Sequence, residues 1–136
     1  MKLIILHFLD IQAKKNIALV ESLSVAAANS GHQVDVVDGI RPTDCLRLAP
    51  YEYVVVVSPS LGFIKGRVHP RVVEVLSSCG NLTGKKGAAL VTKSLFSAAA
   101  ANHVLMRVME REGMVVNDFN ILENPRQATA VGSRLG

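Results

Sequence analysis

The sequence predicts an α/β protein built in three layers, with a five-stranded parallel sheet covered by helices on both faces. Runs of strand length alternate five times with stretches of helical periodicity. The runs at residues 3–8 and 53–57 are almost wholly apolar, which is typical of strands buried on both faces. Such alternation makes successive strands parallel and joins them by right-handed crossovers. The helices of these crossovers then cover both faces of the sheet.

The first half of the chain supplies three of the expected strands. These lie at residues 3–8, 32–37 and 53–57. The last of them is β-branched and uncharged, so we expect it near the centre of the sheet. Residues 13–29 carry one apolar stripe at helical spacing, and Gly31 marks the end of that helix. Residues 42–48 begin with a capping pattern and predict a short helix.

The second half continues the alternation after a loop at residues 58–67. Helices are expected at residues 70–79, at 97–112 and after Asn124, and strands at 87–91 and 114–122. Pro70 and Pro125 suit the first turn of a helix, and Gly113 suits the end of one. The sequence has no internal repeat, low-complexity tract or linker, so we expect a single domain over residues 1–136.

Composition excludes several classes of protein. Hydrophobic residues make up 49% of the chain and charged residues 19%, which excludes a disordered tail and a coiled-coil rod. No apolar run approaches the ~18 residues of a membrane span, so we expect no membrane partner. Cys45 and Cys79 form neither a disulfide framework nor a metal pattern. Free thiols of this kind predict a cytoplasmic location and no metal site.

The charge balance is mildly basic and indicates the kind of partner to expect. Fifteen Lys and Arg against eleven Asp and Glu give a net charge of +4, which permits an anionic partner. Aromatic residues are only 4% of the chain and tryptophan is absent. Because binders of single-stranded nucleic acid use aromatic stacking platforms, we expect no nucleic-acid partner. The sequence assigns no oligomeric state.

Motifs of other doubly wound proteins are missing. Residues 9–13, after the first strand, contain no glycine, which excludes a dinucleotide-binding G-x-G-x-x-G turn. A hydrolase G-x-S-x-G elbow is also absent. The third strand ends in Ser58 rather than in the aspartate of a receiver domain, and no arginine closes a phosphate loop after Cys79. No catalytic residue is therefore assigned, and whether the protein is an enzyme stays open.

Cations gather where a ligand is expected. Ligands of open parallel sheets bind beyond the carboxyl ends of the strands, here at residues 7–13, 58–67 and 92–97. These loops and the adjoining helix start carry Lys14, Lys15, Lys65, Arg67 and Lys93. Asp10 and Asp38 are the opposing charges nearby. Two interpretations remain open, a site for an anion at this edge or ordinary solvated surface cations.

Several phrases, taken in order, resemble the flavodoxin-like family of flavin mononucleotide (FMN) proteins over essentially the whole chain. Residues 51–60 (YEYVVVVSPS) are similar to that family's third strand and the loop after it, and Gly62 corresponds to a glycine of the second flavin loop. Residues 82–86 (LTGKK) resemble the approach to the fourth strand, and residues 130–135 (AVGSRL) the closing helix. The resemblance implies the strand order 2-1-3-4-5.

The resemblance also implies a site and a function. It implies that the protein binds FMN and either carries electrons to a redox partner protein or acts as a small flavin-dependent reductase. Lys14 and Lys15 would face the phosphate, and Phe63 and Phe96 the ring. The other implied contacts come from the second and third loops, from Ser58, Ser60, Gly62 and Thr92. The flavin would supply the chemistry, so no side chain need act as a general acid or base.

The first loop departs from the family pattern. Where the family commonly has Ser-x-Thr-Gly-Asn-Thr, residues 9–14 read LDIQAK, so three hydroxyls and the glycine are missing. At roughly 1.5–3 kcal/mol for each hydrogen bond to a charged group, affinity for phosphate would fall about a thousandfold or more. The family's electron carriers are typically acidic, whereas this chain is basic. The alternative is therefore a degenerate flavodoxin-fold module that binds another anion or a protein without flavin.

Overall fold

The structure is a computed structural model that describes residues 1–41 and 46–136. Five strands form one sheet in the order β2-β1-β3-β4-β5, and every neighbouring pair is parallel. The strands are β1 (Lys2–His7), β2 (Gln33–Asp38), β3 (Tyr53–Ser58), β4 (Lys86–Thr92) and β5 (Val115–Leu122). The predicted architecture and strand order are confirmed, with β3 in the middle of the sheet and all its residues buried.

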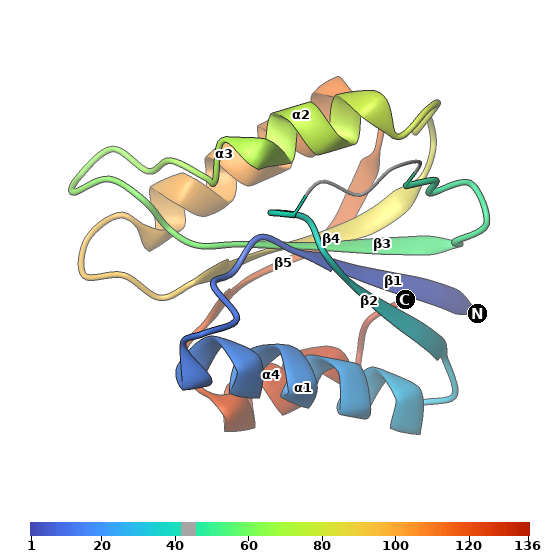
Figure 1. Ribbon diagram of the computed structural model, residues 1–136, viewed down its shortest axis with the longest axis horizontal. Coiled ribbons are helices and arrows are strands. Elements are labelled where there is room, and N and C mark those ends of the chain that lie inside the picture. Colours follow the sequence, from blue (N-terminus) through green and yellow to red (C-terminus); the bar gives the residue numbers. More distant parts are fainter. Residues whose placement is uncertain (42–45) are drawn as a thin grey trace.

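Two layers of helices cover the sheet (Figure 1). The helices are α1 (Lys14–Asn29), α2 (Arg71–Ser78), α3 (Ala98–Arg111) and α4 (Pro125–Gly132). Helices α1 and α4 lie together on one face, while α2 and α3 lie on the other (Figure 1). Each agrees with the sequence prediction to within a few residues. Of the short helix predicted at residues 42–48, residues 42–45 lie outside the described part, and residues 46–48 are not helical.

Alternate residues of the buried strands pack into two separate hydrophobic cores, one on each face of the sheet. On the α1 and α4 face, Ile5 and Val55 pack with Leu23 and the other buried residues of that layer. On the α2 and α3 face, Val54 and Val56 belong to the second core. Because side chains of a strand point alternately to its two faces, one apolar run in β3 supplies both cores. This double burial fixes the position of the loops that follow β1, β3 and β4.

Strand β5 is an edge strand with an irregular register. Gly87 of β4 pairs with Val116, but the next residue pairs with Asp118, so Asn117 is the extra residue of a β-bulge. The bulge lets the Asn117 side chain accept a hydrogen bond from the Tyr53 hydroxyl. Asp118 is placed to pair with Arg134, at 3.2 Å. Bulges of this kind blunt an exposed sheet edge against pairing with another chain.

Among the described residues, no helix combines the length and the apolar character that crossing a membrane requires.

Cys79 is a buried free thiol, and burial raises its pKa. The predicted free thiol at Cys45 lies outside the described residues.

Candidate functional site

Three loops meet at the carboxyl edge of the sheet. We define loop 1 as residues 8–13, after β1, loop 2 as residues 59–70, after β3, and loop 3 as residues 93–97, after β4. Loops 2 and 3 extend beyond the sheet at the same end of the molecule (Figure 1). The predicted site residues all lie in or beside these loops.

Hydrogen bonds to Asp10 fix the conformation of loop 1. Asp10 Oδ1 accepts the Gln12 backbone N–H at 2.9 Å, and the Asp10 carbonyl oxygen accepts the Ala13 N–H at 3.2 Å. Lys14 and Lys15 are exposed in the first turn of α1, which has no side-chain N-cap. A phosphate brought to this turn would find two backbone donors already bonded and a negative charge beside them. The two lysines would offer point charges without an enclosing turn.

The space beneath loop 1 is small. A cavity of about 90 Å³ is lined by His7, Leu9, Ile11 and neighbouring residues of α1. Sites for drug-sized ligands usually measure about 300–1,000 Å³, so this cavity does not hold a flavin ring system. His7 Nδ1 accepts the Leu9 N–H, and burial lowers the His7 pKa. Burial thus disfavours a charged imidazole at His7, and the Nδ1 atom is engaged by the backbone of the sheet edge.

Loop 2 is a braced hairpin. Leu61 and Arg67 exchange two backbone hydrogen bonds of 2.8 Å, which makes residues 62–66 its tip. Gly62 has a φ of +87°, a conformation that favours glycine. Gly66 lies directly on the start of α3, where any side chain would overlap the backbone at Ala101. The tip is thus supported from below by the helix and projects outward.

The hydroxyls of loops 2 and 3 are used within the protein. Ser58 is fully buried, donates to the Pro59 carbonyl oxygen and accepts the His69 N–H. Ser60 Oγ donates to the Thr92 carbonyl oxygen at 2.6 Å and so ties loop 2 to the end of β4. These bonds stiffen the loops. They leave Ser58 no exposed surface for a ligand, and the predicted ligand roles of Ser58, Ser60 and Thr92 stay predictions.

Four large apolar side chains stand out at the ends of loops 2 and 3. Phe63 and Ile64 are each 72% exposed, Leu95 is 85% exposed and Phe96 is 64% exposed. We call these four residues the apolar tip. The Phe63 and Phe96 rings meet edge to face, with centroids 5.4 Å apart at 67°. The two predicted ring contacts are therefore brought together, and they touch one another directly.

The charged residues of the two loops that carry the apolar tip are all basic. Loops 2 and 3 contain Lys65, Arg67 and Lys93 and no aspartate or glutamate. Sequence reasoning selected the two phenylalanines but missed Ile64 and Leu95. The sequence contained a signal for both residues. Each lies beside a phenylalanine in a loop, and loops usually carry polar residues at exposed positions.

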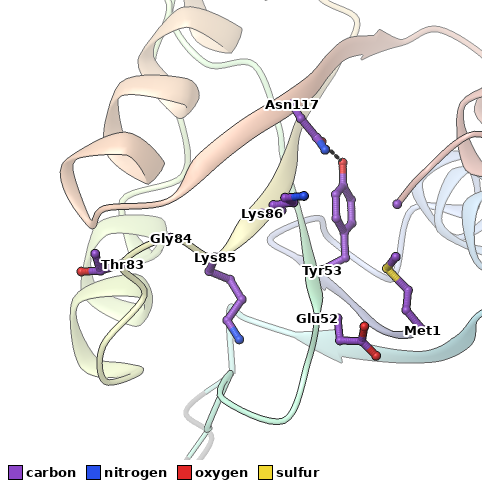
Figure 2. Close-up of a pocket in the computed structure, with 9 residues that line it drawn as sticks. Met1, Glu52, Tyr53, Thr83, Gly84, Lys85, Lys86 and Asn117 are labelled. Atoms are coloured by element: carbon purple, nitrogen blue, oxygen red, sulfur yellow. Dashed lines mark hydrogen bonds between the residues drawn. The ribbon is translucent and has the colours of Figure 1, made fainter.

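A cavity of about 560 Å³ lies at the opposite, amino edge of the sheet (Figure 2). It is lined by Tyr53, Lys86 and Asn117, together with Met1 (Figure 2). Gly136 also lines it. Ligands of parallel sheets bind at the carboxyl edge, and the Tyr53 hydroxyl is already bonded to Asn117. We therefore place the candidate site at the apolar tip and not in this cavity.

The two tyrosines should resist ionisation in the native protein. Burial, with the nearby Asp118 charge, raises the pKa of Tyr53 to about 12. A hydrogen bond to Asp35 raises the pKa of Tyr51 to about 12. The chain has two tyrosines and no tryptophan, so ultraviolet absorbance of phenolate reports these groups alone. We expect native titration near pH 12, against about 10 in denaturant.

The same shifts set a pH window for stability. A raised native pKa means that the stabilisation is complete below pH 10 and is lost as the pH rises from about 10 to about 12. Asp35→Asn should lower the native pKa of Tyr51 and leave that of Tyr53 unchanged. Full ionisation near pH 10 in protein that is still folded would contradict both assignments.

These features define an α/β protein with the flavodoxin fold. Solved structures with this fold superpose on nearly the whole chain. Oxidised flavodoxin 1 from Bacillus cereus has a TM-score of 0.77 at 14% identity, over 98% of this chain and 95% of that chain. A flavodoxin from the domain Archaea has a TM-score of 0.77 at 16% identity, over 98% and 94%. Two-electron reduced flavodoxin from Megasphaera elsdenii has a TM-score of 0.76 at 17% identity, over 96% of both chains.

Neither a family model nor a curated protein sequence matches the chain. Identities of this size show the fold alone.

Proposed function

We propose that this protein is a flavodoxin-fold binding module that engages an acidic partner protein through the apolar tip and holds no FMN. The observation that carries the proposal is the tip itself. Four large apolar side chains are more than half exposed on two braced loops, and the charged residues of those loops are all basic. Exposed apolar surface of this kind, rimmed by charge, marks interaction sites. The predicted cytoplasmic location is part of the proposal.

The residues of loop 1 do not fit the phosphate of FMN. Asp10 places a carboxylate in the turn and occupies the Gln12 N–H, and the hydroxyls of the family pattern are absent. Like charges in one small turn repel, and a dianionic phosphate beside the carboxylate would meet this repulsion. Lys14 and Lys15 offset part of it but supply no enclosing donors.

The tip fits the centre of a protein interface. Interface centres are rich in aromatic and large apolar residues, and binding energy concentrates in a few of them. Two phenylalanines in contact would enter an apolar pocket of the partner as one unit. Lys65, Arg67 and Lys93 would then face acidic residues at its rim, where complementary charge speeds association and selects the partner.

A second candidate function is the FMN-binding electron carrier or small reductase that the resemblance implies. The specific observation in its favour is the pair of aromatic rings on the two loops where the ring of a flavin is expected. In this case Phe63 and Phe96 would separate to cover the ring, and Lys14 and Lys15 would lie nearest the phosphate. The flavin, when bound, would supply the redox chemistry.

Titration of the purified protein with FMN separates the two candidates. We expect a colourless protein and no saturable quenching of flavin fluorescence at ~10 μM ligand, because three lost phosphate contacts weaken binding about a thousandfold. Tight, stoichiometric quenching would replace our proposal with the second candidate. The variant Lys14→Ala, Lys15→Ala would then weaken FMN binding far more than riboflavin binding. Equal losses for both ligands would remove the phosphate from the start of α1.

A further inference from the structure

A cavity of about 500 Å³ lies between α3 and edge strand β5, and an exposed aromatic ring stands beside it. Ala99, Met106 and Ile121 give the cavity an apolar floor. Phe119 lines the same cavity, yet 60% of this residue is exposed to solvent. None of the four residues of the apolar tip lines the cavity, so the two surfaces are distinct. Exposed apolar residues that gather around a groove mark an interaction surface.

The polar groups at the rim of the cavity include both donors and acceptors. His103 lines the cavity, and an imidazole ring can donate as well as accept. Gln127 Oε1 accepts the Glu123 backbone N–H at 3.1 Å, which leaves the Gln127 NH₂ group as a donor and the Glu123 carboxylate as an acceptor. A rim of this mixed kind does not select a small ligand of one charge. It matches a surface that carries the same mixture.

The charged residues beside the cavity are also of both signs. Arg107 and Glu110 are exposed on α3, and each lies one helical turn beyond a residue that lines the cavity, His103 and Met106 respectively. Neither of them, nor Glu123, forms an ion pair with any described residue. This patch can therefore pair its charges with those of its own copy. The loops of the apolar tip carry only basic charges, so two copies would repel one another there.

We propose that two copies of this protein form a two-fold symmetric dimer through α3 and β5, in which Phe119 of each copy enters the cavity of the other. A two-fold interface uses the same patch twice, so that patch must carry a projecting side chain, a cavity to receive it and charges of both signs. The bulge at Asn117 opposes backbone pairing of two β5 strands, so side chains make the contact. Arg107 of one copy would face Glu123 of the other. The dimer is independent of the proposed function and leaves both apolar tips to their acidic partners.

Sedimentation velocity of the purified protein tests for the dimer. We expect the sedimentation coefficient to rise with concentration from the value of a monomer to that of a dimer and no further, because a two-fold interface is closed. Phe119→Ser should weaken the dimer about a hundredfold or more, since each dimer uses this side chain twice. Val25→Ser is the matched control, a 58% exposed residue of α1, and should leave the dimer unchanged. A protein that stays monomeric at ~200 μM, or that associates beyond a dimer, would overturn the proposal.

Further variants test the arrangement within the interface. Ala99→Leu fills the cavity from an exposed helix position and should weaken the dimer at least ~10-fold, although Phe119 is still present. Arg107→Glu should also weaken it, and the added change Glu123→Arg should restore most of the affinity, because the pair is then reversed in both copies. If Glu123→Arg did not restore the dimer, the two-fold arrangement would be wrong.

The apolar tip provides the last comparison. Phe63→Ser with Phe96→Ser should leave the dimer intact, although it removes partner binding at the tip, so either proposal can fail without the other. A dimer that is lost in this variant but persists in Phe119→Ser and Ala99→Leu would place the contact at the tip and overturn the inference.

Discussion

Replacing Phe63 and Phe96 together by serine should weaken partner binding about a thousandfold and leave the fold intact. Aromatic residues at the centre of an interface are each worth ~2 kcal/mol or more, and ~4 kcal/mol corresponds to about three decades in affinity. Both rings are mainly exposed in the free protein, so their loss removes little native packing beyond their mutual edge contact. The measurement is calorimetric titration with the partner, identified by crosslinking in native extract and then purified.

Matched variants separate the tip from general surface effects. Val25→Ser removes a similarly exposed apolar side chain from α1 and should leave binding unchanged. Lys65→Glu with Lys93→Glu should slow association and reverse the salt dependence, because the rim charges steer an acidic partner. Unchanged affinity of the double serine variant would remove the tip from the interface.

The preformed shape of the apolar tip supports the expected thousandfold loss of affinity in the double serine variant. Ser60 ties loop 2 to β4, Gly66 seats it on α3, and the Leu61–Arg67 pair closes its base. Loops that are already ordered lose less conformational entropy on binding, so more of the contact energy appears as affinity. The same bonds explain why four apolar side chains stay exposed rather than collapsing onto the sheet.

The sheet was predictable because burial on two faces leaves a clear pattern. The β-branched run in β3 and its alternation with helical stretches are enough to predict parallel strands and two helical layers. The bulge at Asn117 was not predictable, because one extra residue leaves no trace in a short strand of mixed polarity. The helix predicted to run through Leu48 does not form at residues 46–48, where the tertiary structure overrides a local helical propensity.

The site was predictable only in part. The sequence showed that loop 1 lacks hydroxyls, yet the hydrogen bond from the Gln12 N–H to Asp10 depends on a turn geometry that spacing does not reveal. The contact between Phe63 and Phe96 joins two loops that are far apart along the chain, and only the strand order brings them together. Residue identity thus predicted which edge of the sheet carries the candidate site. Only the fold shows which groups at that edge are free to contact a ligand or a partner.

Gly87→Ala should destabilise the protein by about 3 kcal/mol or more, a large part of the usual 5–15 kcal/mol of a domain. Gly87 lies in β4 directly before the register shift, and a Cβ there would overlap the Val54 carbonyl oxygen of β3. The added methyl would also approach Met114 Cε at 2.9 Å. Since β3 and β4 are both packed on two faces, neither backbone can move without disturbing both cores. The free energy of unfolding in urea measures the loss.

Gly84→Ala is the matched control for this substitution. Gly84 has a φ of +78° and open space around its would-be Cβ, so only backbone strain of about 1–2 kcal/mol opposes the change. The two variants add the same methyl group three residues apart along the chain, one against backbone and one into open space. If Gly87→Ala proved no more costly than Gly84→Ala, the close approach of β3 and β4 would be wrong. The inner strands β3 and β4 could then shift relative to each other, and loops 2 and 3, which follow them, could shift as well. The rigid support that we infer for the apolar tip would then be wrong.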